Sequence, residues 1–494
     1  MIQPISISFE QLNVLTILPM IVTIFGALTI LTIDLITDKL HKSFYVMMTI
    51  MFLMIDLAVV LTYSNDTRGF FDLMLVDGIS LLAQAIILVG SALFVLLALS
   101  QSRFHEYRYP EYFALFLFMV AGFQFMVSSD SLILIFVGIE TSSMAIYTII
   151  AMHNRSKSIE AAIKYFTLGA LATAFFAFGS MVLYGVSGTV ELGKMAEVFV
   201  SSGFANYPYI LIGTVFIVAA LGFKLTLVPF HIWAPDVYEG SSAALAGFIS
   251  IVPKIAGFVV ALRFFEIFIL VENTFVYYLL YFIIVATMTV PNMIALVQTD
   301  IKRMLAYSSI SHAGFALVAV LVGTTRATEG LFLYWILFLF TNLGAFAILW
   351  VHRRKKDKKF GDGHPFEKFA GLVKTSPITA SIMGLFMLSL AGVPPFSLFW
   401  GKMYLIGATI SADELVLAII MALNSAIAVY YYLKLIVFMF LKDKVEDTNI
   451  VVMGNANTTL KSVIGISAII TTVSVLFIDP LLEFIGYYVG ISGF

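Results

Sequence analysis

The sequence predicts an all-α polytopic membrane protein of about 14 transmembrane helices, with two inverted five-helix repeats that each contain a broken helix. Hydrophobic residues make up 61% of the 494 residues, whereas charged residues make up 12%. The mean hydropathy is +1.01. Apolar runs of about twenty residues, long enough to cross a bilayer as a helix, recur along the chain. Two of these runs contain prolines beside ionisable residues, which favours helices that break within the membrane.

The apolar runs define the expected spans in order. They lie at residues 11–36, 43–63, 79–100, 111–128, 131–152, 158–186, 208–233, 243–270, 274–297, 303–323, 328–351, 376–410, 414–441 and 460–487. The seventh and the twelfth are the ones that we expect to be broken, because each is interrupted by proline.

A short internal similarity predicts the repeat. LVPFHIW (Leu227–Trp233) is similar to VPPFSLFW (Val393–Trp400), and YFTLGALA (Tyr165–Ala172) to LFTNLGAFA (Leu339–Ala347). The offset is about five helices, an odd number, so the second copy should be inverted relative to the first. We therefore expect helices 1–3 in residues 1–110, a first repeat (helices 4–8) in 111–270, a second repeat (helices 9–13) in 271–441 and helix 14 in 442–494.

Loop charges predict the orientation. With the N-terminus outside, most basic residues fall on cytoplasmic loops and only Arg68, Lys194 and Arg326 fall outside. The inside set is Lys39, Lys42, Arg103, Arg108, Arg155, Lys157, Lys302, Arg303, the run Arg353–Lys374, Lys434, Lys442, Lys444 and Lys461. This bias predicts that both termini face outward. The basic loop His352–Lys374 is interpreted as topogenic charge, with a surface for a soluble partner as the alternative.

The composition excludes several function classes. There are no cysteines, which rules out disulfides and cysteine-ligated iron–sulfur clusters. The net charge of −2 gives no indication of nucleic-acid binding. There is no P-loop motif, and the N-terminal stretch lacks the basic region of a cleaved signal peptide. The two histidines in apolar runs, His231 and His312, are too far apart in sequence to suggest a haem site.

The stretch Ala219–Gly240 carries the strongest functional signal. Its apolar run contains Lys224 and His231 and is interrupted by Pro229 and Pro235. A buried charge in a membrane helix costs several kcal/mol, so a lysine just before a helix break is typical of an ion pathway. A proline kink with a lysine that reaches the headgroups is the alternative.

Ionisable residues in other spans extend this pattern. Glu140 lies ten residues past Asp130, which places it about 15 Å deep at the helical rise. The others are Lys164, Lys224, Lys254, His312 and Lys402. Such a series predicts a proton relay through water, for which lysine is suited because it can release its proton whereas arginine cannot.

Each of these residues also has a structural interpretation. Glu140 and Lys164 could form a static ion pair, His312 could be a satisfied core histidine, and Lys254 could fill the kink at Pro253. Asp56 is also flanked by apolar residues, and the sequence offers no partner for it. Asp34 and Arg263 are expected to reach the headgroups.

Five long motifs carry a resemblance to a known family. They are VGIETSSMAIYTIIA, EAAIKYFTLGALATAF, FKLTLVPFHIWAPDVYEG, DIKRMLAYSSISHAGF and LAGVPPFSLFWGK. The chain resembles, over essentially its whole length, the antiporter-like proton-channel subunits of respiratory complex I. The PDVYEG ending and Lys402 are most similar to the N-type branch, the counterpart of mitochondrial subunit 2, because the M-type branch carries a glutamate in place of Lys402.

The resemblance implies roles for the same residues. Glu140 and Lys224 match the central ion pair of the first half-channel, and Lys164 a lysine that modulates this pair. Lys254 matches the connecting lysine, His312 a relay histidine and Lys402 the terminal group of the second half-channel. His231 matches the histidine of the broken-helix motif.

The resemblance also implies the setting of the chain. It implies a subunit of a bacterial inner-membrane enzyme that couples electron transfer from NADH, or another donor, to quinone with proton pumping. The chain itself would hold no cofactor, and quinone, NAD, flavin and iron–sulfur clusters would belong to partner subunits. Partners would be the other membrane and peripheral subunits, including the M-type and small K- and J-type subunits, and the lipid bilayer. The alternative is a subunit of a multisubunit sodium/proton antiporter without a redox link. A structural scaffold would have no need of buried lysines.

Overall fold

The computed structural model describes residues 12–37, 40–64, 66–99, 105–203, 207–269, 273–351, 363–444 and 457–492. In these ranges the chain is helical almost throughout, and the strands are β1 (Thr67–Gly69) and β2 (Met74–Val76), an antiparallel hairpin. Lys39, Arg103 and residues 352–362 of the basic loop lie outside the described ranges.

The helices follow one another along the whole described chain. The α-helices are α2 (Leu18–Ile36), α3 (Lys42–Val60), α4 (Gly78–Ala98), α5 (Pro110–Val127), α6 (Leu132–Met152), α7 (Ser156–Ser187), α8 (Leu192–Ser201), α9 (Tyr207–Leu225), α10 (Trp233–Gly240), α11 (Ala243–Ile249), α12 (Val252–Ile269), α13 (Thr274–Leu296), α14 (Ile301–Val322), α15 (Thr325–Val351), α16 (Leu372–Thr375), α17 (Pro377–Ala391), α18 (Ser397–Ser411), α19 (Leu415–Leu441), α20 (Thr458–Val473) and α21 (Ile478–Ile491). Short 3-10 helices are η1 (Val14–Ile17), η2 (His105–Arg108), η3 (Phe366–Phe369) and η5 (Ser474–Phe477).

The predicted spans are present. Within the described ranges, 13 helical segments are long and apolar enough to cross a membrane. They match the predicted spans in order, except the twelfth, which consists of the two shorter helices α17 and α18. The seventh span is also broken, into α9 and α10. The polytopic all-α fold is confirmed. The inverted relation of the repeats and the four segment boundaries stay predictions.

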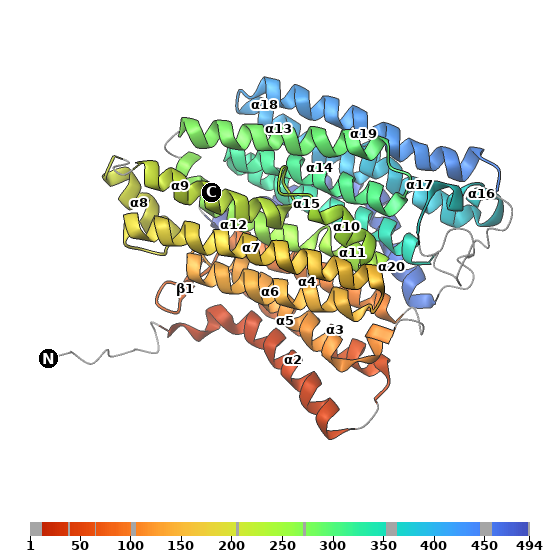
Figure 1. Ribbon diagram of the computed structural model, residues 1–494, viewed down its shortest axis with the longest axis horizontal. Coiled ribbons are helices and arrows are strands. Elements are labelled where there is room, and N and C mark those ends of the chain that lie inside the picture. Colours follow the sequence, from red (N-terminus) through yellow and green to blue (C-terminus); the bar gives the residue numbers. More distant parts are fainter. Residues whose placement is uncertain are drawn as a thin grey trace.

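The long helices lie side by side, with the hairpin and α8 at one end of the bundle and α16 at the other (Figure 1). We call these the hairpin end and the α16 end. At the hairpin end, Leu192 donates a backbone hydrogen bond to Asp130, 2.9 Å away. At the α16 end, Ile301 donates one to His364, also 2.9 Å away. Each end thus joins alternate loops, as a chain that crosses back and forth requires. The charge bias predicts that the α16 end faces the cytoplasm.

The centre of the bundle is the helix pair α11–α12. The apolar window of the segment Ala243–Ile269 is entirely buried, whereas the windows of α2 and α3, at one edge, are mostly exposed. A helix that is apolar all round belongs in the interior, and α12 contacts α4, α5, α9 and α14. Lys254 lies on this central helix and is buried.

Helices α5 and α6 approach each other more closely than side chains would allow. A Cβ atom on Gly122 would lie 2.7 Å from the backbone nitrogen of Ser142, and one on Gly138 would lie 2.7 Å from the carbonyl oxygen of Gly122. Such small-residue contacts are how membrane helices bring their backbones together.

Three elements were not predicted. Helix α8 lies in a loop and buries Leu192, Met195 and Phe199, the spacing of an amphipathic helix. The hairpin is only three residues per strand, too short for an alternation signal. The last span is interrupted by η5 without any proline to announce it.

Candidate functional site

The first helix break places Lys224 at a helix end. Helix α9 ends at Leu225, and the backbone nitrogen of Leu227 donates to the carbonyl of Gly222, 2.7 Å away. Thr226 has a left-handed backbone with φ of 61°, and a cis peptide bond precedes Pro229. The chain becomes helical again at Trp233. Lys224 thus lies in the last turn of α9, where the helix dipole favours a cation.

Lys224 is buried and held by hydroxyl groups. Its Nζ donates to Ser143 Oγ at 2.8 Å and to Ser142 Oγ at 3.3 Å. It also lies 5.9 Å from the centre of the Phe123 ring. Glu140, on the same helix as the two serines, is half-buried and within electrostatic range of Lys224. Among the described residues no direct ion pair joins the two, so their coupling stays a prediction.

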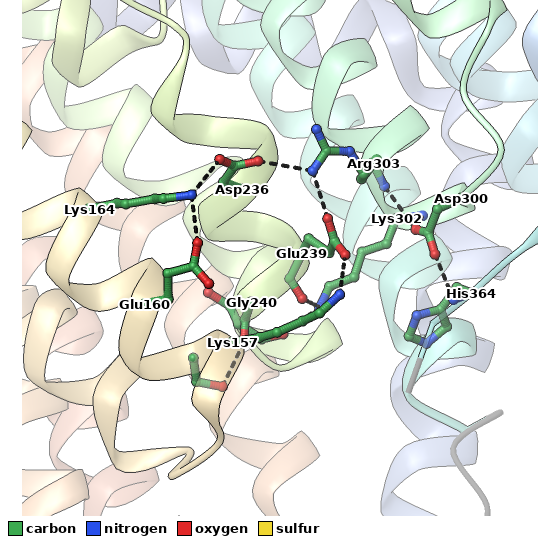
Figure 2. A network of polar contacts seen from close by, with 12 residues as sticks. Lys157, Glu160, Lys164, Asp236, Glu239, Gly240, Asp300, Lys302, Arg303 and His364 are labelled. Carbon is green, nitrogen blue, oxygen red and sulfur yellow. Dashed lines mark hydrogen bonds and ion pairs between the residues drawn. The ribbon is translucent and has the colours of Figure 1, made fainter. Parts of the chain in front are cut away.

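Lys164 faces a different carboxylate from the one that the sequence suggested. Its Nζ pairs with Glu160 at 2.8 Å and with Asp236 at 3.1 Å. The alternative of a static pair between Glu140 and Lys164 is therefore not what the described residues form. Lys164 belongs to a charge network at the break instead (Figure 2).

This network ties α10 to the two halves of the chain. On α10, Asp236 and Glu239 both accept from Arg303 of α14, at 3.0 and 2.6 Å. Glu239 also pairs with Lys157 of α7 at 2.8 Å. Figure 2 shows these groups converging from α7, α10 and α14. A polar pocket of about 140 Å³ lies between α7 and α10 and is lined by Lys157, Glu160, Ala161, Lys164, Asp236, Glu239 and Gly240.

The two α10 carboxylates are kept ionised. Partial burial alone would raise the pKa of Asp236, but the hydrogen bonds from Arg303 and Lys164 outweigh it and hold this pKa below its usual value. Glu239 behaves alike, since partial burial is outweighed by Lys157 and Arg303 and its pKa is lowered. At neutral pH the network therefore consists of charged groups.

His231 lies in the break itself. It is half-buried, and its Nδ1 atom is buried with no hydrogen-bond partner. It follows the cis proline and precedes Trp233, whose ring stacks on Tyr165 at 4.1 Å. The indole nitrogen of Trp233 donates to the carbonyl of Phe223, 3.1 Å away, which ties the far side of the break to the end of α9.

Three buried groups follow one face of α14. Lys254 donates to the carbonyl oxygen and the hydroxyl of Ser309 at 2.7 and 2.8 Å. One turn further, His312 is bonded by Nδ1 to the hydroxyl of Tyr334 and by Nε2 to that of Tyr432, the latter at 3.0 Å. One more turn along, the Lys402 ammonium lies 5.5 Å from the centre of the Phe315 ring. Ser309, His312 and Phe315 are spaced three apart, so they share one face.

Lys402 is bound at the second helix break. It lies in α18 and donates back across the break to the carbonyls of Leu390 and Ala391 at 3.1 and 3.2 Å. These are the last carbonyls of α17. Such groups have no partner within their own helix, so a lysine there satisfies them and matches the negative end of the dipole.

The sequence-predicted residues therefore form two groups. Lys254 and Lys402 are both within electrostatic range of His312. Lys224 packs on the central helix, since a Cβ on Gly257 would lie 3.8 Å from its Cγ, and Gly257 is one turn from Lys254. Lys164 lies apart, in the α10 network. Among the described residues no group of three or more His, Cys, Asp or Glu side chains could hold a metal ion.

Sequence reasoning missed the hydroxyl partners. These are Ser142, Ser143, Ser309, Tyr334 and Tyr432. The available signal was polar residues inside apolar runs, as in ETSSM and YSSISH. Hydroxyls are common in membrane helices, where they bond to their own backbone, so this signal is weak without the packing.

Comparisons with known proteins agree with this arrangement. Residues 129–428 match the family described as NADH:quinone oxidoreductase/Mrp antiporter, TM. The chain is similar to the protein named NADH-quinone oxidoreductase subunit N in Sulfurimonas denitrificans, with 56% identity over 100% of both chains. It is also similar to a chain of respiratory complex I from Thermus thermophilus with bound aureothin, with a TM-score of 0.78, 26% identity and coverage of 94% of this chain and 99% of that one. A chain of an Mrp complex from Dietzia matches with a TM-score of 0.81 and 20% identity, over 96% and 97% of the two chains, which shows the shared fold alone.

Proposed function

Because the chain belongs to the NADH-quinone oxidoreductase subunit N family, we propose that its buried lysines and His312 carry protons along one face of α14. As a member of this family the chain is a proton-translocating, multi-pass membrane subunit of an enzyme complex. The family also fixes the level at which it acts, since a subunit works with other subunits. Which residues move protons is the proposal.

One observation carries the proposal. Lys254, His312 and Lys402 lie along α14 at successive turns, are buried, and have hydroxyl or carbonyl partners rather than carboxylates. Three buried groups that all gain or lose protons, without fixed counter-ions, form a row in which charge can be passed on. Lys224, one turn of α12 from Lys254, extends the row to the first break, where Glu140 supplies the nearby negative charge.

The charge network on α10 gives Lys164 and His231 their places. Asp236 holds Lys164 on the α16 side of the break. From there a change in its pairing would alter the field at Glu140 and Lys224 without direct contact. His231, with a buried Nδ1 atom that has no partner, is available to take a proton or a water molecule in the break.

The setting of the chain is also proposed. We infer partners that hold quinone, NAD, flavin and iron–sulfur clusters, an M-type neighbour and small K- and J-type neighbours, and a bacterial inner membrane. The names of the relatives support a redox partner, and the alternative of a sodium/proton antiporter subunit rests on the shared fold alone. A mass-spectrometric inventory of the purified complex decides between them.

The test of the row is Lys254→Ala, with Lys194→Ala as the matched control. Lys194 lies on α8 at the hairpin end and is exposed and paired with Glu191. Redox-driven proton uptake by inverted membrane vesicles should be lost in Lys254→Ala and retained in Lys194→Ala, at equal complex content. Full uptake in Lys254→Ala would refute the row.

The proposed orientation has its own test. A reporter inserted in the His352–Lys374 loop should lie in the cytoplasm, and one fused after Gly493 should lie outside, because the basic loops collect at one end. Reporters on the same side would show that the orientation, or the number of spans, is wrong.

A further inference from the structure

A second buried acid lies away from α14, among the first helices. Asp56 of α3 is 0% exposed. Its Oδ2 atom accepts a hydrogen bond from Gln124 Nε2 of α5 at 2.7 Å, and its Oδ1 atom is buried without a partner. Among the described residues no cation pairs with it. A carboxylate that is ionised in such a place carries a large cost, because an oxygen atom and a charge are both left unsatisfied.

Four helices each direct a polar side chain to this point. Gln124 also donates to Gln84 of α4 at 3.2 Å, and its oxygen accepts from Thr23 of α2 at 3.1 Å. Gln84 in turn donates to Ser128, just past α5, at 2.9 Å. All of these side chains are buried. Convergent polar groups of this kind are rare in membrane helices and mark sites that have a function.

The cluster reaches the hairpin end. The carbonyl oxygen of Ser128 accepts from the backbone nitrogen of Leu75 in β2, 2.9 Å away, so the hairpin covers the last member. On the other side, Gln124 is adjacent in sequence to Phe123, the ring beside Lys224. Helix α5 therefore separates Asp56 from the lysine row.

Other titratable groups leave Asp56 alone. Helix α3 packs on α2, α4 and α5. Asp34 of α2 and Glu111 of α5 lie at the opposite end, near Tyr45, and Asp77, before α4, pairs with Arg263 at 2.8 Å. Tyr63, past the end of α3, is the titratable neighbour within electrostatic range. No fixed positive charge is therefore available to balance an ionised Asp56.

We propose that Asp56 binds a proton on its carboxyl group, at a site outside the α14 row that is built with Thr23, Gln84 and Gln124 and connected through Ser128 to the hairpin end. The proton adds to the carboxylate oxygen and makes the group neutral, which removes the cost of the uncompensated charge. Gln124 orients the acid by its hydrogen bond. The inference does not depend on the row in α14.

Infrared difference spectra of the intact complex between acidic and alkaline buffer test the site. The wild type should show the C=O stretching band of a protonated carboxyl group, and Asp56→Asn should lack it. Asp34→Asn is the matched control, the same substitution on the neighbouring helix at the opposite end, and should keep the band. Gln124→Leu, which retains the acid but not its hydrogen bond, should shift the band and serves if Asp56→Asn fails to assemble.

Further arms separate the other readings. Ser128→Ala should leave the band in place but slow its shift in D₂O, and an unchanged rate would refute the route to the hairpin end. The same band in wild type and Asp56→Asn would refute the proton site. A band that sodium ions abolish would show a cation site instead. Proton uptake driven by redox turnover should persist in Asp56→Asn, and its loss in an assembled complex would place Asp56 in the row.

Discussion

The two helix breaks follow the same backbone path but hold their lysines in opposite ways. After α9, Leu227 donates to Gly222 at 2.7 Å, and after α17, Val393 donates to Leu388 at 3.0 Å. Each break has a left-handed residue three positions before a cis proline, Thr226 in the first and Gly392 in the second. The backbone alone would therefore make the two sites equivalent.

The lysines make them different. Lys224 precedes its break and donates to hydroxyls of α6, with Glu140 within electrostatic range. Lys402 follows its break and reaches back to the terminal carbonyls of α17. A carboxylate can gain or lose a proton, whereas a helix end has a fixed dipole. The comparison teaches that the first site can be tuned by protonation and the second only by a change in position.

The largest effect is expected at the second site. Lys402→Ala should lower redox-driven proton uptake by about tenfold or more, as loss of an acid–base group does. Assembly should persist, because removing a buried charge also removes its desolvation cost. Lys402→Arg should fail to restore uptake, since arginine does not release its proton. Vesicle proton uptake and native gels measure the two quantities, and wild-type uptake in assembled Lys402→Ala would contradict the prediction.

Gly392→Ala sharpens the same point. Gly392 has φ of 80°, and an added Cβ would lie 2.9 Å from Cδ of Lys402. The substitution should disturb both the turn and the lysine, and uptake should fall less than in Lys402→Ala.

At the first site the expected effect is large but shared. Glu140→Gln and Lys224→Ala should each lower proton uptake several-fold, because each removes one charge of a pair that acts together. The double variant should be little worse than the worse single one, since coupled residues are not additive. The double-variant cycle is measured by proton uptake at equal complex content. Losses that simply add would show that the two residues act independently.

A smaller effect is expected in the network beside the first break. Asp236→Asn removes the carboxylate shared by Lys164 and Arg303, whereas the control Glu160→Gln removes one partner of Lys164 only. Half-exposed ion pairs contribute at most about 1 kcal/mol each, so the complex should assemble with a slightly lower melting temperature. Proton uptake should fall more in Asp236→Asn than in Glu160→Gln, and equal uptake would contradict the role of α10.

The same network sets a pH dependence with a definite sign. The pKa values of Asp236 and Glu239 are lowered in the folded protein. Their stabilisation is therefore complete above the usual carboxyl pKa of about 4 and is lost as the pH falls through the lowered values. Melting temperatures of wild type and Asp236→Asn should converge in acid, and a constant difference would contradict this.

The smallest effect concerns the backbone. Thr226 is a β-branched residue in the left-handed region, a cost of about 1–2 kcal/mol that the equivalent Gly392 avoids. Its buried hydroxyl also has no hydrogen-bond partner. Thr226→Gly should therefore stabilise the break or leave stability unchanged, with proton uptake retained. A large destabilisation would show that the side chain has a further role.

The spans were predictable because they depend on local composition. Apolar length and proline are enough to place α9, α10, α17 and α18, and GLV-type motifs are not needed for that. What could not be predicted is where the charged tips point. Lys164 was expected near Glu140 but meets Asp236, which comes from 72 positions further along the chain. Asp56 had no visible partner, because Gln124 approaches it only when α3 and α5 pack. Such contacts arise from the tertiary arrangement, to which a single sequence gives little access.

The glycine contact of α5 and α6 has a mechanical consequence. With backbone atoms touching at Gly122 and Gly138, the two helices have little freedom to slide or rotate separately, and they move as one rigid body. Phe123 and the serine pair Ser142–Ser143 belong to this body and surround Lys224 from two sides. The lysine itself is carried by α9. A stroke that changes what surrounds this ammonium group must therefore come from the end of α9, so the socket stays still while the plug moves.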